Sequence, residues 1–280
     1  MFPSIHGGWI ATTVFVIAFV VAYPLVLALI ARRKLEVSWR YFGFGALIFF
    51  LFQLISRVPL VNILGQALGS QLRSSQALTW IWLFALALTA GMFEEVGRYI
   101  GYRWLMRREE KTWKKAVMYG LGHGGLESIV LVGGMGVLSL ITLLGLANAA
   151  PGSLSAAQQT QAALAIATVN AQPVWIPLLG AWERLWTIPV HVALSVIVLQ
   201  VFRRGKINWL WLAILAHFLV DFTALAIPQM LGASTTARLI VEGAAALFGL
   251  LAIWITWSLR DRPEQGSALA YVSPVPERAS

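Results

Sequence analysis

The sequence predicts an all-α fold, a polytopic transmembrane helix bundle of about seven spans, and three observations lead to that prediction. Of its 280 residues, 59% are hydrophobic and only 12% are charged, which is about half the charged share of an average soluble domain. The apolar residues form separate stretches long enough to cross a bilayer, and Lys and Arg cluster at alternate ends of these stretches. The composition excludes a water-soluble globular protein and a disordered chain. The absence of cysteine also excludes disulfides and Cys-ligated metal sites.

The spans follow from the apolar stretches taken in order. A window of about 19 residues places them at 9–31, 41–58, 80–102, 116–147, 174–202, 208–228 and 236–259. The first is expected to be a true span and not a cleaved signal peptide, because its basic cluster follows it. We therefore expect one transmembrane bundle over 1–259, with a motif-bearing core at 80–222 and a short polar cytoplasmic tail at 260–280.

The basic residues predict the orientation. Most of the 21 Lys and Arg follow the first, third, fifth and seventh spans, whereas Arg57 and Arg73 are expected on the other side. The positive-inside rule then places the N-terminus outside, the C-terminus in the cytoplasm and the uncharged 148–173 loop outside. Because topology explains the basic clusters, we expect the lipid bilayer and no nucleic acid as partner of an integral membrane protein. The sequence gives no indication of oligomeric state.

Ionisable side chains inside the predicted spans carry the functional information. Each costs about 2.5–3.5 kcal/mol at a helix centre if it faces lipid, so these side chains should face the bundle interior. At 1.5 Å per residue from each basic boundary, one group lies about 11–20 Å deep and forms a single layer contributed by four helices. Its members are Glu94, Glu95, His123, Glu127, His191, His217 and Asp221. A second, outer set is expected about 25–31 Å deep and held by ion pairs; it contains Glu183, Arg184, Arg238 and Glu242.

Spacing adds to the prediction of a chemical site. His123 and Glu127 are four residues apart, as are His217 and Asp221, so each pair shares a helix face and could supply metal ligands or a ligand with its hydrogen-bond acceptor. Two adjacent carboxylates in a low dielectric cannot both be ionised cheaply, which suits a general base or acid near neutral pH. Glycines at 120, 122, 124 and 125 would let another helix or a peptide approach closely.

A structural interpretation competes with this one, because a single intramembrane His or acid often serves only as a hydrogen-bonding group between helices. His191 has the weakest individual case, since its helix carries no acid one turn away, although Glu183, Thr187 and His191 share a face. The convergence of three His and several acids at one depth favours a chemical site.

The ordered motifs EEVGR, GHGGLES, ERLWTIPVH and AHFLVDF resemble the YhfC-type membrane peptidases and, more distantly, the PrsW proteases and the CAAX-processing family. The resemblance covers roughly 80–222, about half the chain. Two departures from the CAAX pattern, Arg98 one residue nearer the acidic pair and Asp221 where Asn is usual, argue against prenyl-protein processing.

The resemblance implies an intramembrane metalloprotease or glutamate-type peptidase that hydrolyses membrane-associated protein or peptide substrates. Glu94 or Glu95 would be the general base, and the water would be polarised by His-bound Zn²⁺ or directly by histidines in a metal-free mechanism. The expected catalytic residues are Glu94, Glu95, Glu127 and Arg98, and the expected metal ligands are His123, His191, His217 and Asp221. Arg98 or His191 could stabilise the oxyanion.

Two alternatives remain at this point. A proton- or ion-coupled transporter would use a buried Glu/His/Asp relay equally well, although the chain shows no inverted repeat. A catalytically inactive membrane scaffold would use the same layer for stability alone.

Overall fold

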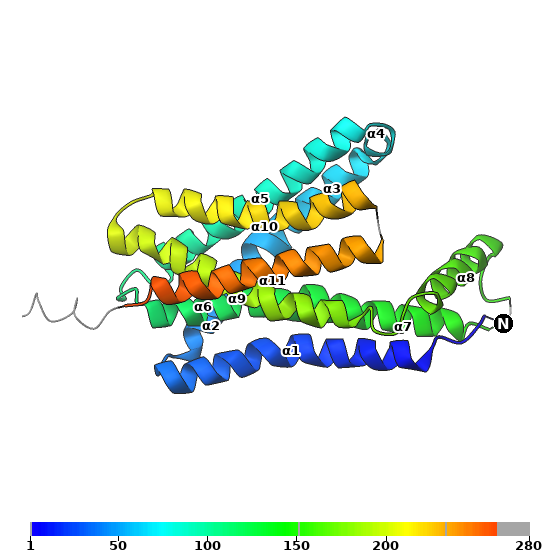
Figure 1. Ribbon diagram of the computed structural model, residues 1–280, viewed down its shortest axis with the longest axis horizontal. Helices are drawn as coiled ribbons and strands as arrows, with labels where there is room; N and C mark the ends of the chain where they lie inside the picture. Colours follow the sequence, from blue (N-terminus) through cyan, green and yellow to red (C-terminus); the bar gives the residue numbers. More distant parts are fainter. Residues whose placement is uncertain (1, 151, 233, 262–280) are drawn as a thin grey trace, which may run out of the picture.

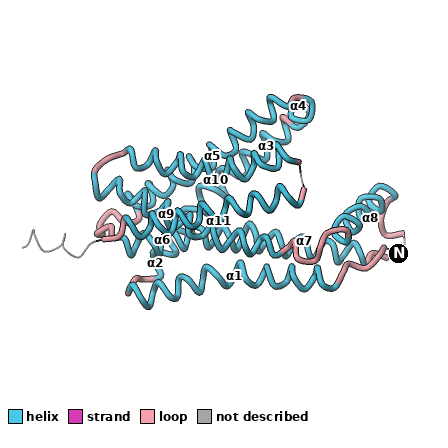
Figure 2. The backbone as a smooth tube through the Cα atoms, in the orientation of Figure 1, coloured by secondary structure: helices cyan, strands magenta, loops and turns pink. Residues whose placement is uncertain are grey.

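The computed structural model describes residues 2–150, 152–232 and 234–261, and in this part of the chain all regular structure is helical (Figures 1 and 2). Seven helical segments are long and apolar enough to cross a membrane, which confirms the predicted fold class and count. They are Gly7–Leu35, Trp39–Ala67, Gln76–Trp104, Trp113–Ala147, Leu178–Arg204, Asn208–Leu231 and Thr235–Ser258. The predicted tail lies outside the described residues beyond Asp261.

Five of the seven segments are single helices. They are α1 (Gly7–Leu35), α5 (Gln76–Trp104), α9 (Leu178–Arg204), α10 (Asn208–Leu231) and α11 (Thr235–Ser258). Short N-capping side chains begin two of them, since Ser75 accepts a hydrogen bond from Leu78 N and Ser234 accepts one from Ala237 N. At the other end, α9 stops at Gly205, whose positive φ of 65° ends the helix.

The other two segments change helix type midway. The second runs through α2 (Trp39–Phe49), the π-helical η1 (Phe50–Arg57) and α3 (Val58–Ala67), and a short helix α4 (Gly69–Ser74) follows it. The fourth runs through α6 (Trp113–Glu127), the π-helical η2 (Ser128–Gly134) and α7 (Met135–Ala147). π-helical turns are uncommon and often accompany functional sites, and here one contains Gln53 while the other begins directly after Glu127.

The helix α9 is the centre of the bundle. It packs against α1, α5, α6, α10 and α11, and every residue from Val190 to Gln200 is buried. A helix that is apolar on all sides is expected in such a central position. The residue His191 is therefore held on a helix that neighbours fix from several directions.

Glycines allow the helices around His123 to approach closely, as the sequence predicted. An added Cβ at Gly45 of α2 would overlap the carbonyl oxygen of Tyr119 on α6, and one at Gly120 would lie 2.6 Å from Val192 Cα on α9. No larger residue fits these contacts without moving backbone. The helix α6 is therefore packed between α2 and α9 at the level of the polar layer.

Two sequence expectations need correction. The stretch 148–173, predicted as a connecting loop, contains α8 (Ala156–Asn170), which begins with a capping box formed by Ser155 and Gln158. Its Ala- and Gln-rich sequence favours a helix, although at 15 residues the helix is too short to cross a bilayer. In addition, Arg57 lies inside the second segment instead of at its outer end, because the helix continues to Ala67.

The close helix contacts give a prediction about stability. Gly45→Ala should lower the free energy of unfolding by about 1–3 kcal/mol, because the new methyl group forces α2 and α6 apart. The matched control is Gly43→Ala on the same helix, where an added Cβ meets nothing within 4 Å. Thermal unfolding in detergent compares them, and equal melting temperatures would contradict close α2–α6 packing.

Candidate active site

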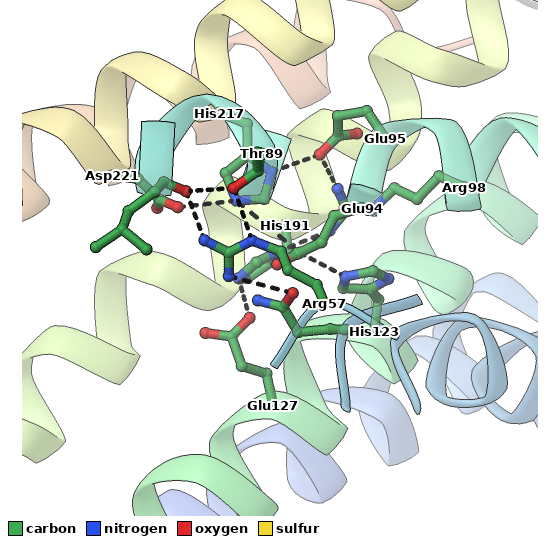
Figure 3. Close-up of polar contacts among 12 residues, drawn as sticks. Arg57, Thr89, Glu94, Glu95, Arg98, His123, Glu127, His191, His217 and Asp221 are labelled. Atoms are coloured by element: carbon green, nitrogen blue, oxygen red, sulfur yellow. Dashed lines mark hydrogen bonds and ion pairs between the residues drawn. The ribbon is translucent and has the colours of Figure 1, made fainter. Parts of the chain in front are cut away.

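The predicted polar layer forms, and four helices contribute to it (Figure 3). Helix α5 supplies Glu94, Glu95 and Arg98; α6 supplies His123 and Glu127; α9 supplies His191; α10 supplies His217 and Asp221. The ring centroids of His123 and His191 are 5.5 Å apart, and those of His191 and His217 are 5.8 Å apart. The three histidines therefore meet at one level, as the depth of each residue along its helix predicted.

Arg98 compensates the charge of the acidic pair. Its guanidinium bonds to Glu95 Oε1 and lies 3.7 Å from Glu94 Oε2. This arrangement needs no special backbone geometry, because residues three and four positions apart share a helix face. Glu95 and Arg98 are completely buried, and buried charges persist only when they are paired and hydrogen-bonded.

The two carboxylates have different surroundings. Glu94 Oε2 is 2.8 Å from His123 Nε2, whereas its Oε1 has no hydrogen-bond partner among the described residues and is not fully enclosed. Glu95 Oε1 accepts hydrogen bonds from Arg98 and, at 2.6 Å, from His217 Nδ1. Because Glu94 lines the cavity and Glu95 does not, Glu94 is the acid that a substrate could reach.

His191 uses both ring nitrogens. Its Nδ1 is 2.8 Å from Arg98 Nη2, and its Nε2 is 2.9 Å from Glu127 Oε2. Because an arginine only donates hydrogen bonds, His191 Nδ1 must accept, and Nε2–H donates to Glu127. From the sequence, His191 was the least certain member of a chemical site, because its acidic partner, Glu127, lies on another helix.

His217 is oriented by Glu95 and faces the cavity. With Nδ1–H donating to Glu95, Nε2 is the ring atom that can gain or lose a proton. That atom is 3.9 Å from Glu94 Oε2 and 3.7 Å from Asp221 Oδ2. A carboxylate that fixes the tautomer of a histidine in this way leaves the other nitrogen free to accept a proton.

The predicted separation of the outer set is incorrect in part. Arg184 Nη1 lies 2.8 Å from Glu127 Oε1 and its Nη2 bonds to Glu183, so Arg184 belongs to the same network as His191. The Glu183–Arg184 pair is confirmed. The expected Arg238–Glu242 ion pair does not form, although both residues are described, and Glu242 Oε2 is buried without a hydrogen-bond partner.

One cavity of about 240 Å³ connects these groups. Its polar lining includes Gln53, Glu94, Glu127, Glu183, Arg184, Thr187, His191, His217, Asp221 and Thr223, and its apolar lining includes Val241, Ala244, Ala245 and Phe248 of α11. The cavity is therefore lined by polar groups of the layer and by apolar side chains that include those of α11. His123, Glu95 and Arg98 do not line the cavity but bond to residues that do, namely Glu94, His217 and His191.

Sequence reasoning missed Gln53 and Arg57. Gln53 is buried and lines the cavity, and Arg57 Nη1 donates to Gln53 Oε1 at 3.3 Å. Arg57 also donates to Thr89 Oγ1 at 3.2 Å and to the carbonyl oxygen of Leu86 (Figure 3). An Arg in the interior of a long apolar segment was a signal, but the predicted span ended at Val58 and so placed Arg57 at its end.

Three buried side chains in the layer have the chemistry of a metal site. One ligand atom each from Glu94, His123 and His191 lie within 4.8 Å of one another, and His123 Nδ1 is buried with no hydrogen-bond partner. Two imidazoles and a carboxylate form a donor set that suits a divalent ion such as zinc, so these residues fit a metal. Two of the predicted ligands, His217 and Asp221, lie outside this group. His217 Nδ1 bonds to Glu95, and Asp221 Oδ2 lies 3.7 Å from His217 Nε2.

Fold and site together define a polytopic helical membrane protein with a buried Glu/His group able to hold a metal. Residues 17–244 match the YhfC intramembrane metalloprotease family, and the chain therefore belongs to that family. It is 33% identical over 239 residues to a protein of Bacillus subtilis (strain 168) named "Uncharacterized membrane protein YhfC", with 83% of this chain and 88% of that protein covered. No solved structure matches.

The buried charge arrangement gives a second prediction. Arg98→Met should lower the free energy of unfolding by about 3–5 kcal/mol, because Glu94 and Glu95 lose their compensating charge in the protein interior. Chemical unfolding in mixed micelles provides the measurement. Arg203→Met is the control, since Arg203 pairs with Asp261 at a partly exposed position, where such a pair contributes about 0–1 kcal/mol. Equal effects of the two substitutions would refute the charge-compensating role of Arg98.

Proposed function

We propose that this protein hydrolyses peptide bonds of membrane-associated proteins or peptides inside the bilayer, with Glu94 as the general base. The observation that carries the proposal is the position of Glu94, which has one oxygen fixed by His123 and the other open to the cavity. A carboxylate held in this way can accept a proton from water next to a peptide carbonyl. The description of the family as intramembrane metalloproteases supports the same reaction class.

The residues of the layer would divide the steps between them. Glu94 Oε1 takes a proton as the water oxygen bonds to the carbonyl carbon. When the carbon–nitrogen bond breaks, the leaving amine needs a proton, and His217 Nε2 is placed to pass one on, 3.9 Å from Glu94 Oε2.

Glu95 fixes the orientation of His217, and Arg98 positions Glu95 and His191. Glu127 holds the other side of His191, and Asp221 stands beside His217 at the cavity surface.

Zinc is the proposed cofactor. His123 and His191 would hold it in the group that they form with Glu94, which remains the base, and it would supply Lewis acidity that polarises a carbonyl and makes water more acidic. His191 gives up one of its present hydrogen bonds in that case, because both ring nitrogens are in use. A metal-free reaction would instead use the hydrogen bonds of the histidines alone.

The lipid bilayer surrounds the seven spans, and we place the protein in a bacterial cytoplasmic membrane with its N-terminus outside. The support for this orientation is the cluster of Arg32, Arg33 and Lys34 in the last turn of α1, and of Arg203 and Arg204 in that of α9.

Loss of the base is the direct test. Purified protein in liposomes is mixed with a quenched-fluorophore library of peptides that each contain one apolar membrane-spanning segment. Wild type should cleave members of the library, and Glu94→Gln should lower kcat by about 10²–10⁴-fold, because it removes the proton acceptor.

Glu110→Gln makes the same chemical change at an exposed position and should cleave like wild type. Cleavage by Glu94→Gln at the wild-type rate would overturn the proposal. Proton flux in the same liposomes that depends on Asp221 would support the transporter instead.

Metal content gives a separate prediction. Elemental analysis of purified protein should find about one zinc per chain in wild type and in His217→Ala, and almost none in His123→Ala. The exposed His6 provides the control, so His6→Ala should retain the ion. Loss of zinc from His217→Ala with retention in His123→Ala would show that the ligands are not the Glu94, His123 and His191 group.

A further inference from the structure

Arg57 holds part of the second membrane segment against α5. Its three donating nitrogens reach Gln53 Oε1, Thr89 Oγ1 and the carbonyl oxygen of Leu86, and the last two acceptors belong to α5. All three acceptors are neutral, and the described residues place no carboxylate within ion-pair distance of Arg57. Hydrogen bonds to neutral groups, and not a direct ion pair, therefore fix the position of the Arg57 side chain.

The contact with Arg57 decides which way the Gln53 amide faces. Because a guanidinium only donates hydrogen bonds, the amide oxygen must face Arg57 and the NH₂ group must point away from it. Gln53 Nε2 donates no hydrogen bond to a described residue and is not among the fully enclosed polar atoms. Since Gln53 lines the same cavity as Glu94, His191 and His217, its NH₂ group is open to that cavity.

Most of the other polar groups of the cavity wall either donate to protein acceptors or are enclosed. Arg184 bonds to Glu127 and Glu183, and His191 and His217 donate to carboxylates. The hydroxyl of Thr223 donates to the carbonyl of Leu219, and that of Thr187 is fully enclosed. Arg98 does not reach the cavity. The NH₂ group of Gln53 is therefore a donor that bonds to no described residue and is open to the cavity.

We propose that Gln53 is a catalytic residue that stabilises the oxyanion, and that Arg57 is its positioning residue; this inference rests on the proposed peptide-bond hydrolysis. As the water oxygen bonds to the carbonyl carbon, the electron pair of the C=O bond moves onto the carbonyl oxygen. Gln53 Nε2–H donates to that oxygen until the C=O bond re-forms and the carbon–nitrogen bond breaks. A preorganised donor of this kind is effective in a water-poor site, and the cation bonded to the amide oxygen polarises the amide further.

The local helix type fits this role. Gln53 and Arg57 lie on η1 (Phe50–Arg57), where the backbone is π-helical between two α-helical stretches. The wider turn changes the direction in which side chains leave the helix. Gln53, on a helix outside the motif-bearing core, thereby lines the same cavity as Glu94.

The test measures kcat and KM with the liposome library described above. Gln53→Leu should lower kcat by about 10²–10³-fold, the loss typical for an oxyanion donor, with little change in KM. Gln53→Glu keeps the shape of the side chain and the bond to Arg57 but lacks the N–H donor, so it should show the same loss of kcat. This variant provides the test if Gln53→Leu folds poorly.

The chain offers a matched control in Gln200. It is also buried, also lies four residues before an arginine, and accepts from Arg204 Nε at 3.0 Å, but it does not line the cavity. Gln200→Leu should therefore keep the wild-type kcat at an equal melting temperature. Arg57→Met should lower kcat, and the double variant Arg57→Met with Gln53→Leu should fall no further than Gln53→Leu alone, because the arginine acts through the amide.

The outcomes separate the two proposals. If cleavage depends on Glu94 and Gln53→Leu retains a kcat within twofold of Gln200→Leu, the inference about Gln53 is overturned while the proposed function stands. If no cleavage depends on Glu94, the proposed function is overturned, and the catalytic role of Gln53 with it.

Discussion

The rest of the site depends on the buried guanidinium of Arg98. It compensates Glu94 and Glu95 on its own helix and contacts His191 on α9, so one cation fixes groups on two helices. From Glu95 the hydrogen bonds continue to His217, and from His191 they continue through Glu127 to Arg184. In a medium where each unpaired charge costs several kcal/mol, this network determines both how the helices assemble and which acid remains available for chemistry.

The depth of the layer was predictable because a helix advances a fixed distance per residue. Counting along four helices placed Glu94, His123, His191 and His217 at one level, and the structure confirms it. Pairing between helices was not predictable in the same way. Glu127 was expected to serve His123 one turn away, yet it bonds to His191 and Arg184, because the rotation of each helix about its axis is decided by packing contacts such as those of Gly120 and Gly45.

Gln53 and Arg57 could not be recognised as site residues from the sequence, and the reason is physical. Gln53 is uncharged, so its place inside a span carries no cost that would single it out, and Arg57 stood where the predicted span ended. The distinction between Glu94 and Glu95 also needed the structure. Neighbouring residues on a helix point about 100° apart, and only the positions of His217 and the cavity show that Glu94 faces the cavity while Glu95 bonds to His217.

The cavity extends from the layer toward Glu183, close to the start of α9, whereas His123 lies about 15 Å from the opposite end of α6 by helix rise. On the other side of the layer, Arg98, Glu95 and His123 are packed without exposure. The side chains that arrange the layer therefore also leave the bundle tightly packed between the cavity and the start of α6, where a charged species would have to lose its hydration shell to enter.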